Sequence, residues 1–128
     1  LTDSWYWNRD ADTRAWSRKF FEKVKRMPSS IQAGDYSATL QYLNAVKATG
    51  SDDSDKVLAQ MKKTPVNDIF AKGGFIRGDG RMVHDMYLMQ VKSPDKSVEP
   101  WDYYNVVQTF KGEQAWTTKA ESKCALWK

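Results

Sequence analysis

The stretch of residues 33–50 constrains the fold of this chain more than any other part of its sequence. Asp35 suits a helix N-cap, because its carboxylate can accept from first-turn N–H groups, and Gly50 can adopt the left-handed conformation that ends a helix. Between them an apolar stripe recurs at helical spacing and should be buried. The face with this spacing carries Tyr36, Leu40, Leu43 and Val46, with Lys47 next to Val46. We therefore expect a strand over residues 29–33, a polar turn and a helix.

The corner between this strand and helix is a candidate ligand site. Open α/β sheets bind ligands beyond their strand ends, where the N-terminus of a helix points N–H groups at the ligand. Asp35 and the phenol of Tyr36 would lie at that corner. A structural interpretation stays open, in which Tyr36 is a core residue and Asp35 only a cap.

The N-terminal part carries three consecutive aromatic residues, Trp5, Tyr6 and Trp7. Their side chains would alternate between the two faces of a strand, so both faces would be covered. An amphipathic helix over roughly residues 12–26 should follow, and Pro28 should end it. Together with the elements above, this gives the order strand, helix, strand, helix, which is typical of an α/β fold.

A third helix is expected after Gly50. The acidic run of residues 51–55 would lie at its positive N-terminal end, and Lys62 and Lys63 would lie at its negative end, before Pro65. The acidic run could in principle be a calcium loop, but it lacks the spaced ligands, central Gly and terminal Glu of an EF-hand. A helix start that matches the helix dipole is the preferred interpretation.

From residue 66 onward the pattern changes to strands. Asp79-Gly80 between apolar segments predicts a β-hairpin. The strand after it, residues 82–92, is largely apolar on both faces and should lie inside a sheet. Residues 93–100 are typical of a polar connection, residues 101–110 of a further strand, and the rest of an irregular tail.

Few residues could carry catalysis or bind a metal. His84 is the only imidazole and Cys124 the only thiol, so a zinc site has too few ligands and no disulfide can form within the chain. His84 and Asp85 would point to opposite faces of a strand. No nucleophile motif or phosphate-binding loop accompanies them. We therefore expect no enzyme, no metal site and no cofactor.

Charge and hydropathy argue against two further classes. The chain has 20 basic and 16 acidic residues, and the net charge of +4 is spread along the sequence without a basic stripe, so no nucleic-acid partner is expected. No apolar run approaches the ~20 residues that cross a bilayer. The six Trp, six Tyr and five Phe must instead line a core, a ligand cleft or an interface.

Several ordered motifs resemble the C-terminal part of ABC-transporter substrate-binding proteins of the branched-chain amino acid type, closest to the branch that captures aromatic acids. These motifs are Ser4-Trp5-Tyr6-Trp7-Asn8, Asp35-Tyr36-Ser37-Ala38, Asp79-Gly80-Arg81, His84-Asp85 and Pro100-Trp101-Asp102-Tyr103-Tyr104. The resemblance covers essentially all 128 residues.

The resemblance implies a partial type I periplasmic-binding-protein (Venus flytrap) fold of the α/β class. Its two lobes would close on a small amino acid or aromatic carboxylic acid in the periplasm and deliver it unchanged to a membrane permease. Residues 1–27 and 93–128 would belong to the second lobe, and residues 28–92 to the first. The implied ligand contacts are Tyr36, Asp35, Ser37, Trp5, Tyr6 and Trp7.

The resemblance also implies that the part of a receptor before Leu1 is missing from this chain. Taken alone, the chain should then leave an apolar seam around Trp5, Trp7 and residues 82–92, which should drive self-association. An alternative from another class is a small self-associating interaction module with no small-molecule ligand. The two functions differ in whether any ligand stabilises the protein.

Overall fold

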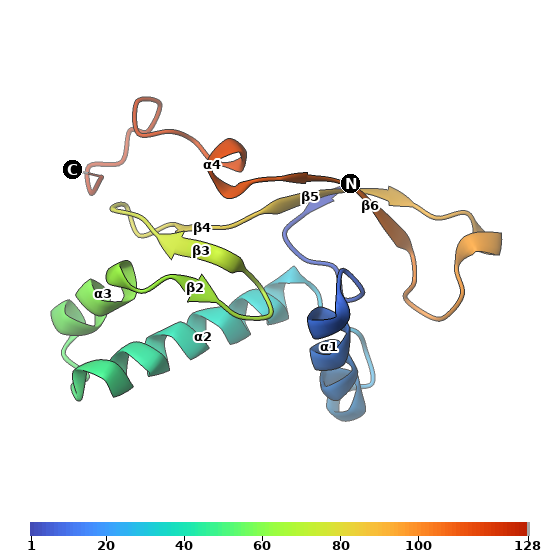
Figure 1. Cartoon of the computed structure of the whole chain (residues 1–128), viewed down its shortest axis with the longest axis horizontal. Coiled ribbons are helices and arrows are strands. Elements are labelled where there is room, and N and C mark those ends of the chain that lie inside the picture. The colour runs from blue at the N-terminus through green and yellow to red at the C-terminus, as the bar shows by residue number, and fades with distance from the viewer. Residues whose placement is uncertain (128) are drawn as a thin grey trace.

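The computed structural model describes residues 1–127, and Lys128, the last residue of the expected segment 93–128, lies outside the described part. The helices of the described chain are α1 (Ala11–Val24), α2 (Ser30–Thr49), α3 (Ser54–Lys63) and α4 (Gly112–Ala115). Its strands are β1 (Thr2–Asp3), β2 (Val66–Asn67), β3 (Lys72–Ile76), β4 (Met82–Val83), β5 (Met86–Val91) and β6 (Tyr104–Phe110). The predicted α/β class is confirmed (Figure 1).

Helices α1 and α3 form where the sequence predicts them. Asp10 caps α1 through a capping box with Thr13, whose N–H donates to Asp10 Oδ1 at 2.9 Å. Lys25 ends the helix in the left-handed conformation, with a φ of 61°. Asp53 caps α3, whose first turn is acidic and whose last turn is basic, as the helix dipole favours. The acidic run therefore serves as a helix start.

Helix α2 begins earlier than expected, and the predicted strand over residues 29–33 is wrong. Ser29 is the N-cap, and its N–H donates to Gln32 Oε1 at 2.8 Å in a capping box. Ser-x-x-Gln is a signal for a helix start, and here it overrides the extended interpretation. Asp35 is therefore a residue of the second turn and not a cap. Gly50 ends the helix with a φ of 62°, as predicted.

Strands β2, β3 and β4 form an antiparallel sheet in that order. The predicted hairpin joins β3 to β4, where the N–H of Arg77 donates to the carbonyl of Arg81 at 3.0 Å and Gly80 takes a φ of 85°. Helix α2 lies below this sheet in the view of Figure 1, and α3 lies beside it at the left. The core cluster of this region contains Trp5, Ala33, Val66, Phe70 and Ala71.

The second sheet has the order β1, β5, β6 and is also antiparallel. Strand β5 lies between two strands, as predicted for residues 82–92, but the predicted strand is interrupted at His84 and Asp85 and divides into β4 and β5. The carboxylate of Asp85 accepts the N–H of Gly112 at 3.1 Å and Lys111 Nζ at 2.9 Å. These bonds fix the chain where it passes from one sheet to the other.

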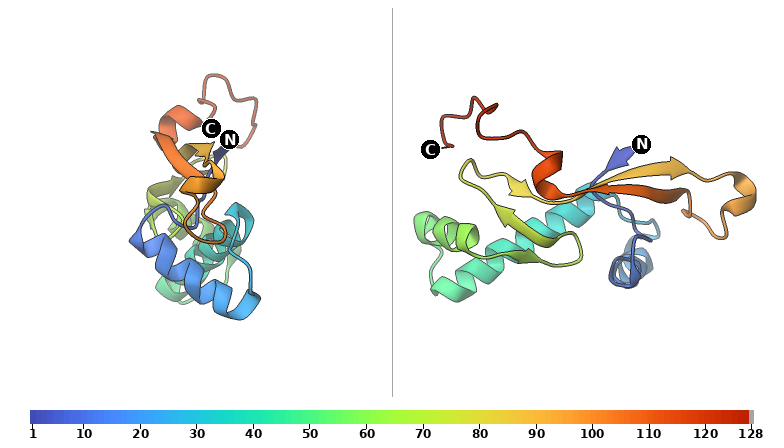
Figure 2. Two further views of the ribbon diagram at one scale, coloured as in Figure 1. Left: turned by 90° about the vertical axis from the view of Figure 1, so that its right-hand side faces the viewer. Right: turned by 45° about the horizontal axis from the view of Figure 1, so that its top comes forward.

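Strands β5 and β6 form a ribbon that extends away from α2 and α3 (Figure 2). The expected polar connection joins them as antiparallel neighbours and includes a short 3-10 turn at Pro94–Lys96. None of the helices described between residues 1 and 127 is long and apolar enough to cross a membrane.

The N-terminal aromatic run is not a strand, contrary to the prediction. Strand β1 contains only Thr2 and Asp3, and the three aromatic residues lie in the loop before α1. Trp5 and Trp7 are both 3% exposed, so the expected exposed seam at these two residues is also wrong. Trp5 packs in the core beside β2 and β3, whereas Trp7 packs with Met89 of β5. The loop thus connects the cores of the two sheets.

Candidate functional site

The residues expected to contact a ligand lie in three places. Trp5, Tyr6 and Trp7 line one cavity beside the start of α2. Asp35 and Tyr36 lie on the exposed face of α2 and line a separate hollow. Ser37 lies on the opposite, buried face of the same helix.

The aromatic cavity has a volume of about 230 Å³ and lies where four segments of the chain meet. These segments are the N-terminal loop, the connection from α1 to α2, strand β5 and the start of β6. Residues of its wall include Trp5, Tyr6, Trp7, Ser29, Ser30 and Met89. Mostly apolar walls with a few polar groups are typical of small-molecule sites, and drug-sized ligands need roughly 300–1,000 Å³. The cavity therefore suits a smaller molecule.

Two of the three aromatic rings are fixed by hydrogen bonds to the β5–β6 connection. The phenol of Tyr6 donates to Asp102 Oδ1 at 3.1 Å and accepts the N–H of Tyr104 at 3.3 Å. Trp7 Nε1 donates to the carbonyl of Trp101 at 2.7 Å. Buried aromatic side chains with a polar tip usually find such partners, and here the partners hold the cavity wall rigid.

The third ring, Trp5, is held by packing and by the guanidinium of Arg9, which lies 5.5 Å from its ring centroid. It stacks on Phe70 with centroids 6.3 Å apart and meets Trp16 edge-to-face at 5.7 Å. Its Nε1 is buried and finds no hydrogen-bond partner among residues 1–127. A buried donor without an acceptor costs free energy of folding. The indole N–H of Trp5 is such a donor in the wall of this cavity.

A buried ion pair supports the cavity, and the sequence analysis missed it. Asp102 is 1% exposed and accepts Lys92 Nζ at 2.7 and 2.8 Å and the N–H of Val98 at 3.2 Å. Hydrogen bonding to Lys92 lowers the pKa of the Asp102 carboxyl below its usual 3.8. The only sequence signal was an acid within an aromatic motif, and spacing alone could not reveal its partner.

Burial raises the pKa of Tyr6 to about 12, which predicts a loss of stability at high pH. The folded pKa lies above the usual 10.0, so the unfolded state releases the proton first, and stability present below pH 10 declines as the pH rises toward 12. Urea unfolding between pH 9 and 12 should show this decline, and Tyr6→Phe should make it shallower. An equally steep decline in the variant would contradict this assignment.

Tyr36 and Asp35 lie on the outward face of α2. Tyr36 is 41% exposed, and its ring packs against Trp16 with centroids 5.1 Å apart. It therefore is not a sealed core residue. The hollow beside it measures about 330 Å³ and is lined by Asp35, Tyr36, Thr39, Leu40 and Leu43.

Ser37 lies on the inward face of α2. It is fully buried, and its Oγ donates to Asp68 Oδ2 at 2.6 Å. Asp68 also accepts the N–H groups of Phe70 and Ala71 at 2.8 and 3.0 Å in the turn between β2 and β3. Ser37 therefore fastens the helix to the sheet and is removed from both hollows.

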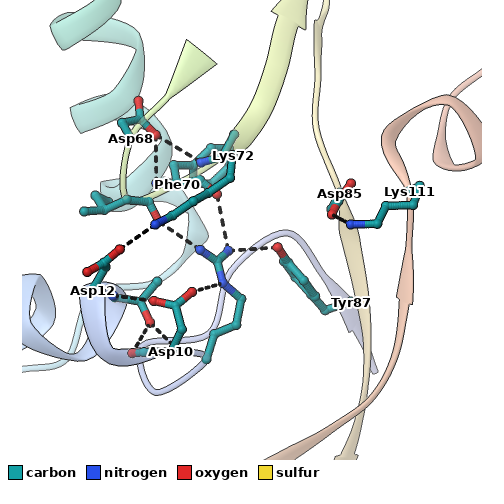
Figure 3. A network of polar contacts seen from close by, with 12 residues as sticks. Asp10, Asp12, Asp68, Phe70, Lys72, Asp85, Tyr87 and Lys111 are labelled. Atoms are coloured by element: carbon teal, nitrogen blue, oxygen red, sulfur yellow. Dashed lines mark hydrogen bonds and ion pairs between the residues drawn. The ribbon is translucent and has the colours of Figure 1, made fainter. Parts of the chain in front are cut away.

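A second polar network, centred on Arg9, joins α1 to both sheets. Arg9 Nη2 donates to the carbonyl of Ile69 at 3.0 Å, and Nη1 donates to the carbonyl of Phe70 at 3.3 Å and to the Tyr87 phenol at 3.0 Å. Figure 3 shows Asp10, Phe70 and Tyr87 converging from three different segments. The sequence analysis did not single out Arg9, because its partners lie far along the chain.

The contacts of His84 indicate a structural role. Its ring lies between Phe70 and Trp116, with centroids 5.0 and 4.9 Å away, and its Nδ1 lies 2.9 Å from the carbonyl of Asp85. Cys124 is exposed in the C-terminal tail. Within residues 1–127, no group of three or more His, Cys, Asp or Glu side chains is placed to hold a metal ion.

An α/β chain with a small aromatic cavity beside a helix start has the features of a ligand-binding protein. The sequence model for periplasmic binding proteins matches residues 1–97. The chain therefore belongs to the periplasmic binding protein family, which supplies the substrate-binding components of ABC transporters, as its motifs suggest.

Solved structures agree with this assignment. A periplasmic binding protein from Burkholderia mallei is 63% identical over 100% of this chain, with a TM-score of 0.96. A branched-chain amino acid ABC transporter periplasmic ligand-binding protein from Burkholderia xenovorans is 46% identical over 99% of it, with a TM-score of 0.95. An amino acid ABC transporter substrate-binding protein from Pseudomonas fluorescens, 21% identical over 98%, shares the fold with a TM-score of 0.83.

This chain spans only about a third of these proteins, namely 34%, 34% and 33% of their respective lengths. No curated protein matches it.

Proposed function

We propose that the chain is part of a solute receptor of an ABC uptake transporter. The receptor binds a small amino acid or an aromatic carboxylic acid between two lobes and passes it unchanged to a membrane permease. Membership of the periplasmic binding protein family supports this proposal and a periplasmic location. The name of the Burkholderia xenovorans protein supports an amino acid ligand. We propose no catalytic step.

The observation that carries the proposal is the aromatic cavity beside the start of α2. Trp5, Tyr6 and Trp7 supply flat apolar walls of the kind that aromatic or branched side chains pack against. Ser29 and Ser30 bring the positive end of the α2 dipole to the same cavity, where a carboxylate would be favoured. One cavity thus combines a site for an apolar side chain with a site for an anion.

Tyr36 and Asp35 complete the proposed contacts from the exposed side of α2. They would meet a ligand when a second part of the receptor closes over that side. Ser37 belongs to the proposal as a positioning residue, because it holds α2 through Asp68. The lobe segments, 1–27 and 93–128 against 28–92, remain a proposal. The sheet in which β5 pairs with β1 and β6 would then cross the boundary between them.

Replacing Tyr36 with alanine should weaken ligand binding. The test uses a full-length receptor in which the matching third of the Burkholderia mallei protein is replaced by this chain. A thermal-shift screen with leucine, phenylalanine and benzoate identifies a ligand, and calorimetry then measures its affinity. Loss of a stacking contact of about 0.5–1.5 kcal/mol predicts roughly a two- to tenfold higher Kd.

Tyr42→Ala is the matched control, because Tyr42 has a similar exposure on the same helix but does not line the hollow. Its Kd should equal that of the parent. An unchanged Kd for Tyr36→Ala would remove Tyr36 from the site.

The alternative function is a self-associating module without a small-molecule ligand. It is favoured by exposed apolar residues on the β5–β6 ribbon and its connection, among them Val91, Val98 and Val107. Sedimentation of the 128-residue chain would show association that grows with concentration. Failure of all ligands in the screen, together with such association, would favour the module.

A further inference from the structure

The excess positive charge of this chain is concentrated in α1 and the two residues that follow it. Residues 14–26 hold six of the 20 basic residues and one of the 16 acidic residues, a net charge of +5. The other 14 basic and 15 acidic residues have a net charge of −1. Contrary to the expectation, the charge is therefore not spread along the sequence. The six basic residues are Arg14, Arg18, Lys19, Lys23, Lys25 and Arg26.

These six residues lie on the outer side of α1, which we call the basic face. On the inner side Thr13 and Ser17 are buried. Trp16 meets Trp5 of the aromatic loop with ring centroids 5.7 Å apart. All six basic residues are exposed, and α1 lies at the lower margin of the molecule in Figure 1. The basic face therefore points away from the core of the described chain.

Most of these cations have no counter-charge within the described chain. Arg18 pairs with Glu99 at 2.6 Å. The other five basic side chains form no ion pair with any of residues 1–127. Burying a cation without a partner costs free energy. The basic face is therefore suited to water or to an anionic partner, and not to burial in a core.

Helix stability explains only part of this arrangement. Lys23, Lys25 and Arg26 lie at the C-terminal end, where the helix dipole favours cations. Arg14 and Arg18, however, form a pair of like charges at i and i+4, which destabilises a helix. A structural role therefore does not account for the cations in the first half of α1.

We propose that the basic face of α1 binds reversibly to the anionic headgroups of a phospholipid membrane. Clusters of roughly four to eight Lys and Arg on an amphipathic helix are typical of such binding. The inner side of α1 is packed within the chain, so the contact is electrostatic and involves no insertion of the helix.

The composition of the basic face favours a lipid surface over an acidic protein. Protein interfaces are enriched in aromatic residues and depleted in lysine. Half of the six basic residues are lysines, and none of the aromatic residues between positions 14 and 26 is exposed. A surface with many mobile anionic groups fits such a face. A nucleic-acid partner does not fit a family of periplasmic proteins.

The test measures cosedimentation of the full-length chimeric receptor with vesicles. One set contains phosphatidylcholine alone, and the other contains equal amounts of phosphatidylcholine and phosphatidylglycerol. The receptor should bind only the anionic vesicles, and raising the salt from about 0.05 to 0.5 M should release it, because salt screens exposed charges. Equal binding to both sets, or no binding to either at low salt, would overturn the proposal. The inference goes beyond the proposed function and its test uses no solute ligand, so either can fail without the other.

A triple variant assigns the binding to α1. Its partition coefficient for the anionic vesicles should fall at least about tenfold, since each basic residue near an anionic surface contributes to binding. The three changes are Lys19→Gln, Lys23→Gln and Arg26→Gln.

The matched control removes the same charge from exposed positions of α2 and α3. Its three changes are Lys47→Gln, Lys56→Gln and Lys63→Gln. The partition coefficient should fall less than about twofold, because screened charges remote from the contact contribute little. An equal fall in both triple variants would overturn the proposal, since net charge and not the basic face would then cause the binding.

A gain of binding tests the same face without a weakened variant. Glu22 is the single acidic residue within residues 14–26. Glu22→Gln should raise the partition coefficient roughly two- to fivefold, and an unchanged coefficient would overturn the proposal. Immobilised poly-glutamate represents an acidic protein surface. Binding of the parent to poly-glutamate but not to anionic vesicles would assign the face to an acidic protein and would also overturn the proposal.

Discussion

Replacing Asp102 with alanine should destabilise the protein by about 3–5 kcal/mol, the usual cost of removing one partner of a buried ion pair. The change leaves Lys92 Nζ without its carboxylate partner and the Tyr6 phenol and Val98 N–H without the acceptor they now use. Typical domains are stable by only 5–15 kcal/mol, so this single change should remove a large part of the total. Urea unfolding at pH 7 measures the loss.

Asp95→Ala is the matched control, because Asp95 lies in the same connection and pairs with Lys96 at 3.6 Å on the exposed surface. Exposed pairs contribute about 0–1 kcal/mol. A double variant, Lys92→Met with Asp102→Leu, should recover most of the loss, since apolar replacements remove the need for a buried counter-charge. A cost below about 1 kcal/mol for Asp102→Ala would show that the pair is not effectively buried.

The same carboxylate should make stability sensitive to acid. Its hydrogen bond to Lys92 lowers the folded pKa, so the stability that it contributes is present above the usual value of 3.8 and declines as the pH falls through the folded pKa. Asp102→Asn should therefore show a shallower decline below pH 4 than the parent chain does.

Local sequence signals predicted the elements whose causes are local. The helices near residues 12–26 and 54–63 and the turn at Asp79-Gly80 depend on caps, dipole matching and a glycine conformation. These causes act within a few residues of the chain. They can be recognised without knowledge of the tertiary structure.

The mistaken strand over residues 29–33 shows competition between two local signals. Ser29 and Gln32 form a capping box, and the short segment before Asp35 was interpreted as extended because Asp35 was assigned the cap. The capping box determines where the helix begins, because it satisfies backbone donors at Ser29 and in the first turn. The predicted strand over residues 5–7 is wrong for another reason. Consecutive aromatic residues occur both in strands covered on two faces and in buried loops, so residue type alone cannot distinguish the two.

The sequence names candidate ligand contacts, but it does not give their arrangement. The predicted ligand contacts Trp5, Tyr6 and Trp7 line one cavity, and their contact with a ligand stays a prediction. The groups that hold them come from distant parts of the sequence: Tyr6 bonds Asp102 across 96 positions and Arg9 bonds Tyr87 across 78. Such pairs are set by the tertiary fold, and a single sequence contains no periodic signal for them.

Arg9→Met should destabilise the protein by about 2–4 kcal/mol. The guanidinium satisfies two carbonyls in the turn between β2 and β3 and the Tyr87 phenol, and it lies over the rings of Trp5 and Tyr87 at 5.5 and 5.0 Å. Methionine would fill the space but donate nothing, so these partly buried acceptors would lose their partner. Urea unfolding monitored by tryptophan fluorescence measures the loss, because Trp5 lies against the altered side chain.

Two further variants separate the geometry of Arg9 from its charge. Arg9→Lys keeps the charge but cannot reproduce a planar fork that reaches three acceptors. It should therefore be destabilised almost as much as Arg9→Met. Arg14→Met removes an arginine from the first turn of α1, five residues after Arg9, whose bond to Asn8 is exposed, and it should change stability by no more than about 0.5 kcal/mol. Full stability in Arg9→Lys would mean that charge alone suffices. If the fork is needed, Arg9 is the residue that fixes α1 against the two sheets and so sets the position of the aromatic loop between them.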